Sequence, residues 1–267
     1  MSEASQMRRR RLPRALGALT LAFLATALLM AALASSALAT ATTTKTAWYS
    51  GATAGSVSAL TGKPTITAEI GEDPNVAKHF FFKTALEERS VSITTGTASC
   101  VECVVSNELT GLAGPETAQI RGKLSFGEAT VTVSEGHCVL AGGKLTTNTL
   151  MIETDYMEGE TWIARMFPEF GPTPISFTIE KEGALSCPVA GTYSVAGFQY
   201  AAFEAKTGAF QQEQTLHFSK AISSAASGET PGFPATWLVK APKVRLFETY
   251  GTLKLKIGGA SPYFGMK

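Results

Sequence analysis

The feature that most constrains the fold of this chain is a two-residue alternation of apolar and polar side chains in short runs. In the run at residues 120–126, the alternate positions are Ile120, Gly122, Leu124 and Phe126. Successive side chains of a β-strand point to opposite faces, so this period is typical of strands with one buried and one hydrated face. Further runs of the same kind lie at residues 129–133, 175–179, 189–195, 216–218 and 253–257.

Strands that are hydrated on one face belong to antiparallel sheets, and these runs are bounded by turn-forming Gly, Pro and Ser. Residues 40–267 contain 31 Thr and only two Asp. Thr suits a pleated surface, whereas Asp often starts helices. The sequence therefore predicts an all-β fold, an antiparallel β-sandwich or open barrel, with few or no helices outside the N-terminal segment.

Three segments need separate predictions. We expect strands at residues 78–86 and 90–97, joined by a charged turn at 87–89, although Asp73-Pro74 could instead start a helix that runs to Arg89. Residues 153–174 contain several prolines and acidic residues, which argue against regular pairing, and we expect a short helix or a capping loop at Trp162–Phe170. The Ser-, Gly- and Pro-rich stretch Ser223–Pro234 predicts an exposed loop.

The N-terminus has the pattern of an export signal. Five arginines at positions 8–14 precede the uncharged apolar run from Ala15 to Ala34, and Ala37-Leu-Ala39 has the small residues of a cleavage site. We expect a signal peptide at residues 1–39, cleavage between Ala39 and Thr40, and a single all-β domain at residues 40–267. The alternative is that the apolar run, which is long enough to span a bilayer, is kept as a membrane anchor.

Removal of this segment changes the charge balance. The whole chain has 23 basic and 22 acidic residues, and residues 40–267 keep 18 and 21 of them. A chain with a net charge of −3 lacks the basic surface of nucleic-acid-binding proteins, so we expect no nucleic-acid partner. Lys240, Lys243 and Arg245 form one small basic cluster, which we interpret as a solvated strand edge.

Four cysteines in an exported chain predict two disulfides. Cys100 and Cys103 form a C-x-x-C motif, but a redox centre of the thioredoxin type needs a helix start, and a zinc site with His137 would need close ligand spacing. In a regular strand, positions three apart face opposite sides. We therefore predict Cys100–Cys187 and Cys103–Cys138. The alternative is Cys100–Cys103 with Cys138–Cys187, which would require residues 99–104 to bend.

Residues for catalysis are scarce. His79, His137 and His217 have no metal-ligand spacing, and Asp73 and Asp155 are the only aspartates. This composition disfavours a Ser-His-Asp triad and an Asp-rich calcium loop. The chain also lacks the glycine-rich phosphate-binding motifs. We predict no catalytic residue, no metal and no cofactor.

Aromatic residues are the remaining candidates for ligand contact. The pair Trp48-Tyr49 together with Trp162 and Trp237 could form a stacking platform for sugars or lipids, although β-sandwich cores also take up such side chains. The apolar C-terminal segment, residues 262–267, either docks on the sheet or contacts a partner.

Three stretches resemble a known group of sequences. They are GALSCPVAGTYSVAG at residues 183–197, GGKLTTNTL at residues 142–150 and TLKLKIGG at residues 252–259. Each is similar to a recurring stretch of an uncharacterised family of secreted, β-rich proteins from soil actinobacteria. The resemblance loosely covers residues 90–260 and implies a signal peptide, an exported β domain and paired cysteines, but no activity. Gly-Glu-Ala at residues 127–129 stands where relatives often have Gly-Cys, so the cysteine pairing of the family does not transfer directly.

Together these features predict a secreted or cell-envelope β-sandwich protein with a binding or structural role rather than an enzyme. The alternative is an extracellular hydrolase whose site is built from Glu and Ser residues on loops. A concave site with convergent polar groups would distinguish the two.

Overall fold

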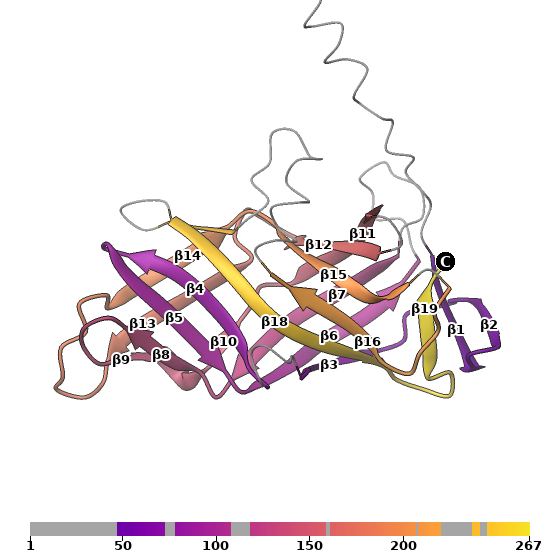
Figure 1. Cartoon of the computed structure of the whole chain (residues 1–267), viewed down its shortest axis with the longest axis horizontal. Coiled ribbons are helices and arrows are strands. Elements are labelled where there is room, and N and C mark those ends of the chain that lie inside the picture. Colours follow the sequence, from indigo (N-terminus) through magenta and orange to yellow (C-terminus); the bar gives the residue numbers. More distant parts are fainter. Residues whose placement is uncertain are drawn as a thin grey trace, which may run out of the picture. The chain divides into compact units, whose positions relative to one another are not determined.

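The computed structural model describes residues 47–72, 78–107, 118–158, 161–206, 208–219, 237–240 and 245–267 (Figure 1). These residues belong to one compact unit, Thr43–Lys267. The expected signal peptide at residues 1–39, its cleavage site at Ala39 and Thr40, and the expected loop at Ser223–Pro234 lie outside the described residues.

The described part of the chain is all-β, as the alternation predicts. Its one helical element is a single 3₁₀ turn, η1 (Ala141–Gly143). The strands, in chain order, are β1 (Trp48–Thr53), β2 (Ser56–Ala59), β3 (Ile66–Ile70), β4 (Phe80–Leu86), β5 (Arg89–Thr95), β6 (Thr97–Ser106), β7 (Gln119–Gly127), β8 (Thr130–Val133), β9 (Cys138–Leu140), β10 (Leu145–Thr146), β11 (Leu150–Glu158), β12 (Thr161–Pro168), β13 (Ile175–Lys181), β14 (Gly191–Ala196), β15 (Gln199–Lys206), β16 (Gln214–Phe218), β17 (Trp237–Lys240), β18 (Arg245–Ile257) and β19 (Tyr263–Met266).

The strands form a small sheet and a large curled one. The small sheet has the order β19-β1-β2, and the main path of the large sheet has the order β10-β7-β11-β12-β15-β16-β18-β17-β14-β13-β9. Strands β3 and β4 both pair with β18, β5 joins β4 to β8, and β6 pairs with β7. The pairs along these paths are antiparallel. Isolated bridges, Thr65 to Val104 and Thr147 to Ile175, add contacts between strands that are not neighbours along this path.

The thirteen-residue strand β18 is the central element of this architecture, and it crosses Figure 1 diagonally. Its second half pairs with β16 on one side and with β3 on the other. Its first half pairs with β17 and β4. Gly251 lies where the partners change, with a φ of 129°, and a Cβ there would lie 2.8 Å from the ring of Phe80. Only glycine fits this backbone position without strain.

The alternating runs face the core as expected. In β7, Ile120, Gly122, Leu124 and Phe126 are all buried. Phenylalanines from separate strands meet at the centre, with ring centroids 4.9 Å apart for Phe80 and Phe126 and 5.4 Å apart for Phe82 and Phe247. Such aromatic pairs add about 0.5–1.5 kcal/mol beyond the burial of their area. The first pair packs β4 against β7, and the second packs β4 against β18.

The turn prediction near residue 87 is confirmed. Strands β4 and β5 pair from Phe80 and Thr95 to Leu86 and Arg89, with a two-residue turn between them. Glu87 and Glu88 both have positive φ angles, 47° and 69°, as a tight hairpin turn of this kind requires. The alternative helix running to Arg89 is therefore wrong across the described residues 80–89.

The prediction for residues 153–174 is wrong in its first half. Trp162–Pro168 is neither a helix nor a loop but lies in β12, which pairs with β11 and β15. Trp162, Ile163, Ala164 and Met166 are all buried, so both faces of this strand are covered. A strand that is buried on both faces shows no alternation, and for this reason the sequence pattern did not reveal it.

The apolar C-terminal segment docks on the sheet. Strand β19 pairs with β1, and Phe264 and Met266 are almost completely buried. Trp48 packs in the same region, with its ring centroid 5.7 Å from that of Phe264. Trp48 and Trp162 are each only 1% exposed, so both pack in the core and neither can form a stacking platform, and the side chain of Trp237 lies outside the described part.

Candidate functional site

All four cysteines are paired, but the predicted connectivity is wrong. The disulfides are Cys100–Cys103 and Cys138–Cys187, with Cα–Cα distances of 5.6 and 5.2 Å. Neither predicted pair, Cys100–Cys187 or Cys103–Cys138, is formed. The sulfur atoms are bonded to one another, so they are not zinc ligands in this state.

A bulge in β6 explains the error. The register of β6 against β7 shifts between Val101 and Val104, and Glu102 has a φ of 55°. An extra residue of this kind moves each side chain that follows it in the strand to the opposite face of the sheet. Cys100 and Cys103 therefore point to the same face of the sheet. In a regular strand, two residues three positions apart would point to opposite faces.

Gly122 makes room for this local disulfide. It lies on β7 beside the bulge, and a Cβ at this position would be 2.6 Å from the Cα of Cys103 and would also overlap its sulfur. The glycine in the alternating run of β7 thus leaves the space that the cystine fills.

Each of the three histidines has a different neighbour. His137 lies 3.7 Å from a carboxylate oxygen of Glu182, and His217 lies 3.5 Å from one of Glu204. His79 is near the ring of Phe81. In the part of the chain that the structure describes, no three His, Cys, Asp or Glu side chains gather where they could hold a metal ion.

A hollow opens where β4 and β18 separate, and it is the candidate site. The two strands pair only at Glu248–Tyr250 with Phe81–Lys83. Beyond Lys83, β4 continues with β5, whereas Arg245–Phe247 of β18 pair with β17. The two strands therefore diverge and leave a gap in the wall of the sheet.

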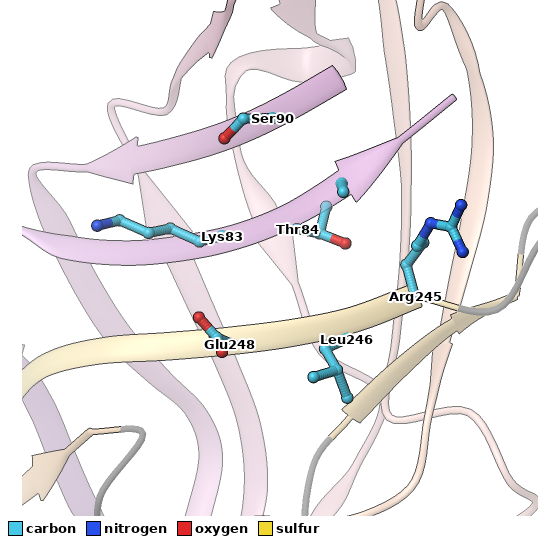
Figure 2. Close-up of a pocket in the computed structure, with 7 residues that line it drawn as sticks. Lys83, Thr84, Ser90, Arg245, Leu246 and Glu248 are labelled. Atoms are coloured by element: carbon cyan, nitrogen blue, oxygen red, sulfur yellow. The ribbon is translucent and has the colours of Figure 1, made fainter. Parts of the chain in front are cut away.

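We call this hollow the β4–β18 fissure, and its volume is about 400 Å³. Seven residues line it: Lys83, Thr84, Ala85, Ser90, Arg245, Leu246 and Glu248 (Figure 2). They provide two cations, one carboxylate, two hydroxyls and two apolar side chains. A concave site that combines apolar surface with a few polar groups is the usual form of a small-molecule site.

One end of the fissure holds a compact polar cluster. The hydroxyl of Tyr250 donates a hydrogen bond to the carboxylate of Glu248, 2.6 Å away, and the ammonium of Lys83 lies 5.1 Å from the centre of the Tyr250 ring. Burial, and next the adjacent carboxylate, raise the pKa of Tyr250 to about 12. The phenol therefore stays protonated and keeps donating to Glu248 throughout the neutral range.

The other end contains Thr84 and Arg245. The Thr84 hydroxyl is buried and has no hydrogen-bond partner within the described residues. Figure 2 shows this hydroxyl and the side chain of Arg245 directed into the space between the two strands. Six other buried side-chain atoms of the described residues also lack a hydrogen-bond partner, so the unpartnered hydroxyl does not by itself indicate a ligand.

Arg245 was interpreted from the sequence as part of a solvated strand edge. Arg245 pairs with Val239 of β17 on one side, whereas on the other side β18 joins β4 only from Glu248 onward, so Arg245 borders an open stretch of strand edge. Lys243 lies outside the described residues. The sequence carried no signal for the fissure, because it arises from strands that are far apart in the chain.

A second group of charges lies on the outer face of the sheet. Lys254 and Lys256 of β18 contact Glu213 at 2.7 and 3.3 Å, and Lys256 also contacts Glu69 of β3. The carboxylate of Glu213 raises the pKa of Lys254, and those of Glu69 and Glu213 raise the pKa of Lys256. These charges neutralise one another across β18, β3 and the bend that precedes β16, so we interpret the group as structural.

Comparison of the chain with protein-family models, with curated proteins and with solved structures finds no match. No helix in the described ranges is long and apolar enough to cross a membrane. The function is therefore inferred from the geometry of the chain itself.

Proposed function

We propose that this chain is a secreted or cell-envelope binding protein whose ligand site is the β4–β18 fissure. The two disulfides support an oxidising compartment, because such bonds persist outside the cytosol. The export pattern of residues 8–39 and the resemblance to a secreted actinobacterial family agree with this location.

The observation that carries the proposal is the fissure itself. Its lining brings two cations, one carboxylate and two hydroxyl-bearing side chains next to the apolar Ala85 and Leu246. Such a combination can hold a small ligand by its polar end and cover its apolar part.

The alternative, an extracellular hydrolase, would draw on Ser90 and Glu248, which both line the fissure. A serine nucleophile needs a base within hydrogen-bond reach. The carboxylate of Glu248 instead accepts from the Tyr250 hydroxyl at 2.6 Å. This contact favours binding over hydrolysis as the function of the site.

The test is a thermal-shift screen of small metabolites against the purified exported protein. We expect some compounds to raise the Tm of the wild type, because a ligand that binds only the folded state stabilises it. The variant Ala85→Trp fills the fissure and should abolish the shift. The matched control Ser176→Trp, on exposed surface of β13, should retain it. A shift that survives Ala85→Trp, or no shift with any compound, would contradict the proposal.

A separate experiment tests the proposed export and cleavage of the chain. N-terminal sequencing of the exported form should begin at Thr40, because residues 8–39 have the pattern of a cleaved signal. An exported or membrane-held form that still contains Ala15–Ala34 would contradict cleavage.

A further inference from the structure

Building on the proposed function of the fissure, we infer the class of its ligand: a short extended peptide, held by main-chain hydrogen bonds as an additional strand between β4 and β18. The main-chain groups of Ala85 on one wall and of Leu246 on the other bind it. The side chains of the lining then select among peptides rather than supply the main contacts.

The direction of the main-chain groups along β4 follows from its hairpin with β5. The two strands are joined by a two-residue turn, and in such a hairpin the flanking residues, Leu86 and Arg89, exchange hydrogen bonds with each other. Because main-chain groups alternate in direction along a strand, those of Thr84 also point toward β5. The N–H and C=O groups of Lys83 and Ala85 point the opposite way, toward β18.

The same alternation on β18 leaves a second open edge. Lys83 lies directly across from Glu248, so the main-chain groups of Glu248 face β4, and those of Leu246, two positions earlier, face the same way. The pairing of the two strands stops at Lys83 and Glu248, and Figure 2 shows the strands diverging toward Arg245. Ala85 and Leu246 are therefore the positions of the next hydrogen-bonded pair, which the divergence prevents from forming.

Ala85 and Leu246 thus direct main-chain donors and acceptors into the fissure. On this side, neither residue has a backbone partner among the described residues. Open strand edges of this kind are templates for a further strand. An extended peptide presents N–H and C=O groups to its two sides in alternation, so one of its residues can bond to Ala85 and the next to Leu246.

The side chains at the two open positions favour apolar, β-branched residues in the peptide. Ala85 and Leu246 both line the fissure, and Leu246 is 48% exposed although it is a large apolar side chain. Apolar side chains that are neighbours on one face of a sheet stabilise it, so a residue such as Val fits beside Leu246. β-branched residues also suit an extended backbone.

The experiment uses the exported protein with both disulfides intact and follows its amide resonances by NMR. The probe is the capped tetrapeptide acetyl-Val-Thr-Val-Thr-amide, and the matched control is the same peptide with each of its four residues N-methylated. The tetrapeptide should shift the amides at residues 83–85 and 245–248 in a saturable way. The methylated peptide should bind about tenfold more weakly or worse, because it keeps the side chains and carbonyls but has lost the N–H donors.

Hydrogen exchange at single amides tests the assigned contacts directly. The tetrapeptide should slow the exchange of the Ala85 and Leu246 amides about tenfold or more, because both gain a hydrogen bond. The amide of Thr84 faces β5 in the free protein and serves as the internal control, so its exchange should not change. Equal slowing of the Thr84 and Ala85 amides would indicate a general tightening of β4 and would overturn the assigned pairing.

Two variants separate main-chain from side-chain contacts. Ala85→Pro removes the N–H that points into the fissure and should weaken binding of the tetrapeptide about tenfold or more, and proline is tolerated where a strand N–H has no ladder partner. Thr84→Val should change the affinity less than about twofold, because the Thr84 hydroxyl is buried and the main chain is unchanged. An equal loss of binding in both variants would contradict main-chain recognition. If Ala85→Pro does not fold, the comparison of the two peptides on the wild type still decides the question.

The outcomes separate the peptide class from the proposed function. If the methylated peptide binds as tightly as the unmethylated one, the fissure remains a binding site but main-chain recognition is wrong. If the tetrapeptide shifts the amides of another strand and not those of the fissure, the peptide site is wrongly placed. If it shifts no amides, the peptide class is overturned, and the metabolite screen with Ala85→Trp then decides whether the fissure binds any ligand.

Discussion

The two disulfides cross-link the sheet in opposite ways. Cys100–Cys103 closes a loop within one strand, with a sequence separation of three, and fixes a bulge in β6. Cys138–Cys187 has a sequence separation of 49 and ties the start of β9 to the connection between β13 and β14. Both cysteines of the second pair are almost fully buried. One bond therefore shapes a strand locally, whereas the other restrains a long stretch of chain.

The difference shows that the effect of a disulfide depends on the length of the loop that it closes. In the chain-entropy model the stabilisation grows with the logarithm of the loop length. By this relation the disulfide that closes the long loop stabilises the folded state by about 4 kcal/mol, and the one that closes the short loop by about 1.5 kcal/mol. The short bond is then better understood as fixing local geometry than as a major source of stability.

The largest effect should come from the long loop. Replacement of both cysteines, Cys138→Ser with Cys187→Ser, should lower the free energy of unfolding by about 4 kcal/mol, because the unfolded chain regains the entropy of the closed loop. Urea denaturation followed by circular dichroism measures this. A loss smaller than that of the Cys100–Cys103 double variant would reverse the comparison.

Gly122→Ala tests the packing around the short loop. The added Cβ would overlap Cys103, and overpacking of this kind costs about 1–3 kcal/mol. Gly55→Ala is the control, because a Cβ there meets nothing within 4 Å, and it should change stability by less than about 0.5 kcal/mol. Equal effects of the two substitutions in urea denaturation would show that the cystine does not need the space at Gly122.

The double variant Cys100→Ser with Cys103→Ser should cost only about 1.5 kcal/mol. Its clearer signature is local, because the bulge at Val101–Val104 loses its cross-link. Hydrogen exchange should accelerate most in β6 and in its partner β7, with little change around β9 and β13. Uniform acceleration across the sheet would contradict a local role for this bond.

The smallest effect concerns Tyr193, which reinforces the region of the long loop. Its hydroxyl donates to the carbonyl of Val189 at 2.8 Å, just beyond Cys187. Tyr193→Phe should cost about 1 kcal/mol, the usual net value of one buried hydrogen bond. Tyr49→Phe, on half-buried β1, is the control and should have little effect.

The pH dependence of this contact has a defined sign. Burial, and next the charge of Glu87, raise the pKa of Tyr193 above 10.0 in the folded protein. The folded state therefore holds the proton more tightly than the unfolded state, and this stabilisation is complete below pH 10 and falls as the pH rises further. In urea denaturation at pH 8 and pH 10.5, Tyr193→Phe should lose less stability between the two values than the wild type. An equal loss in both proteins would contradict the assignment.

The sequence predicted the half-buried strands but not the exceptions to their pattern. Strands such as β7 and β13 alternate because one face is wet, and their alternate residues are indeed buried. Strand β12 was missed because both of its faces are covered. The bulge at Glu102 was missed because it depends on a single residue with positive φ, which no period reveals. The cysteine pairing was wrong for the same reason.

The candidate site could not be predicted for a different physical reason. The fissure depends on which strands pair with each half of β18, and antiparallel pairing between distant segments is a property of the whole fold. From the sequence alone, Arg245 appeared to be one of three neighbouring basic residues. Only the pairing of Arg245–Phe247 with β17 places it at the gap that Thr84 also lines.

Peptide mapping without reduction tests the central claim, which is the contrast between the two cross-links. Trypsin cuts after Arg89 and Arg121, so Cys100 and Cys103 fall in the same peptide, residues 90–121. Cys138 falls in the peptide 124–144, and Cys187 falls in the peptide 182–206. We predict that the first peptide is found unlinked with an internal disulfide and that the other two are found as one disulfide-linked pair. A peptide 90–121 that is linked to both of the others would contradict it.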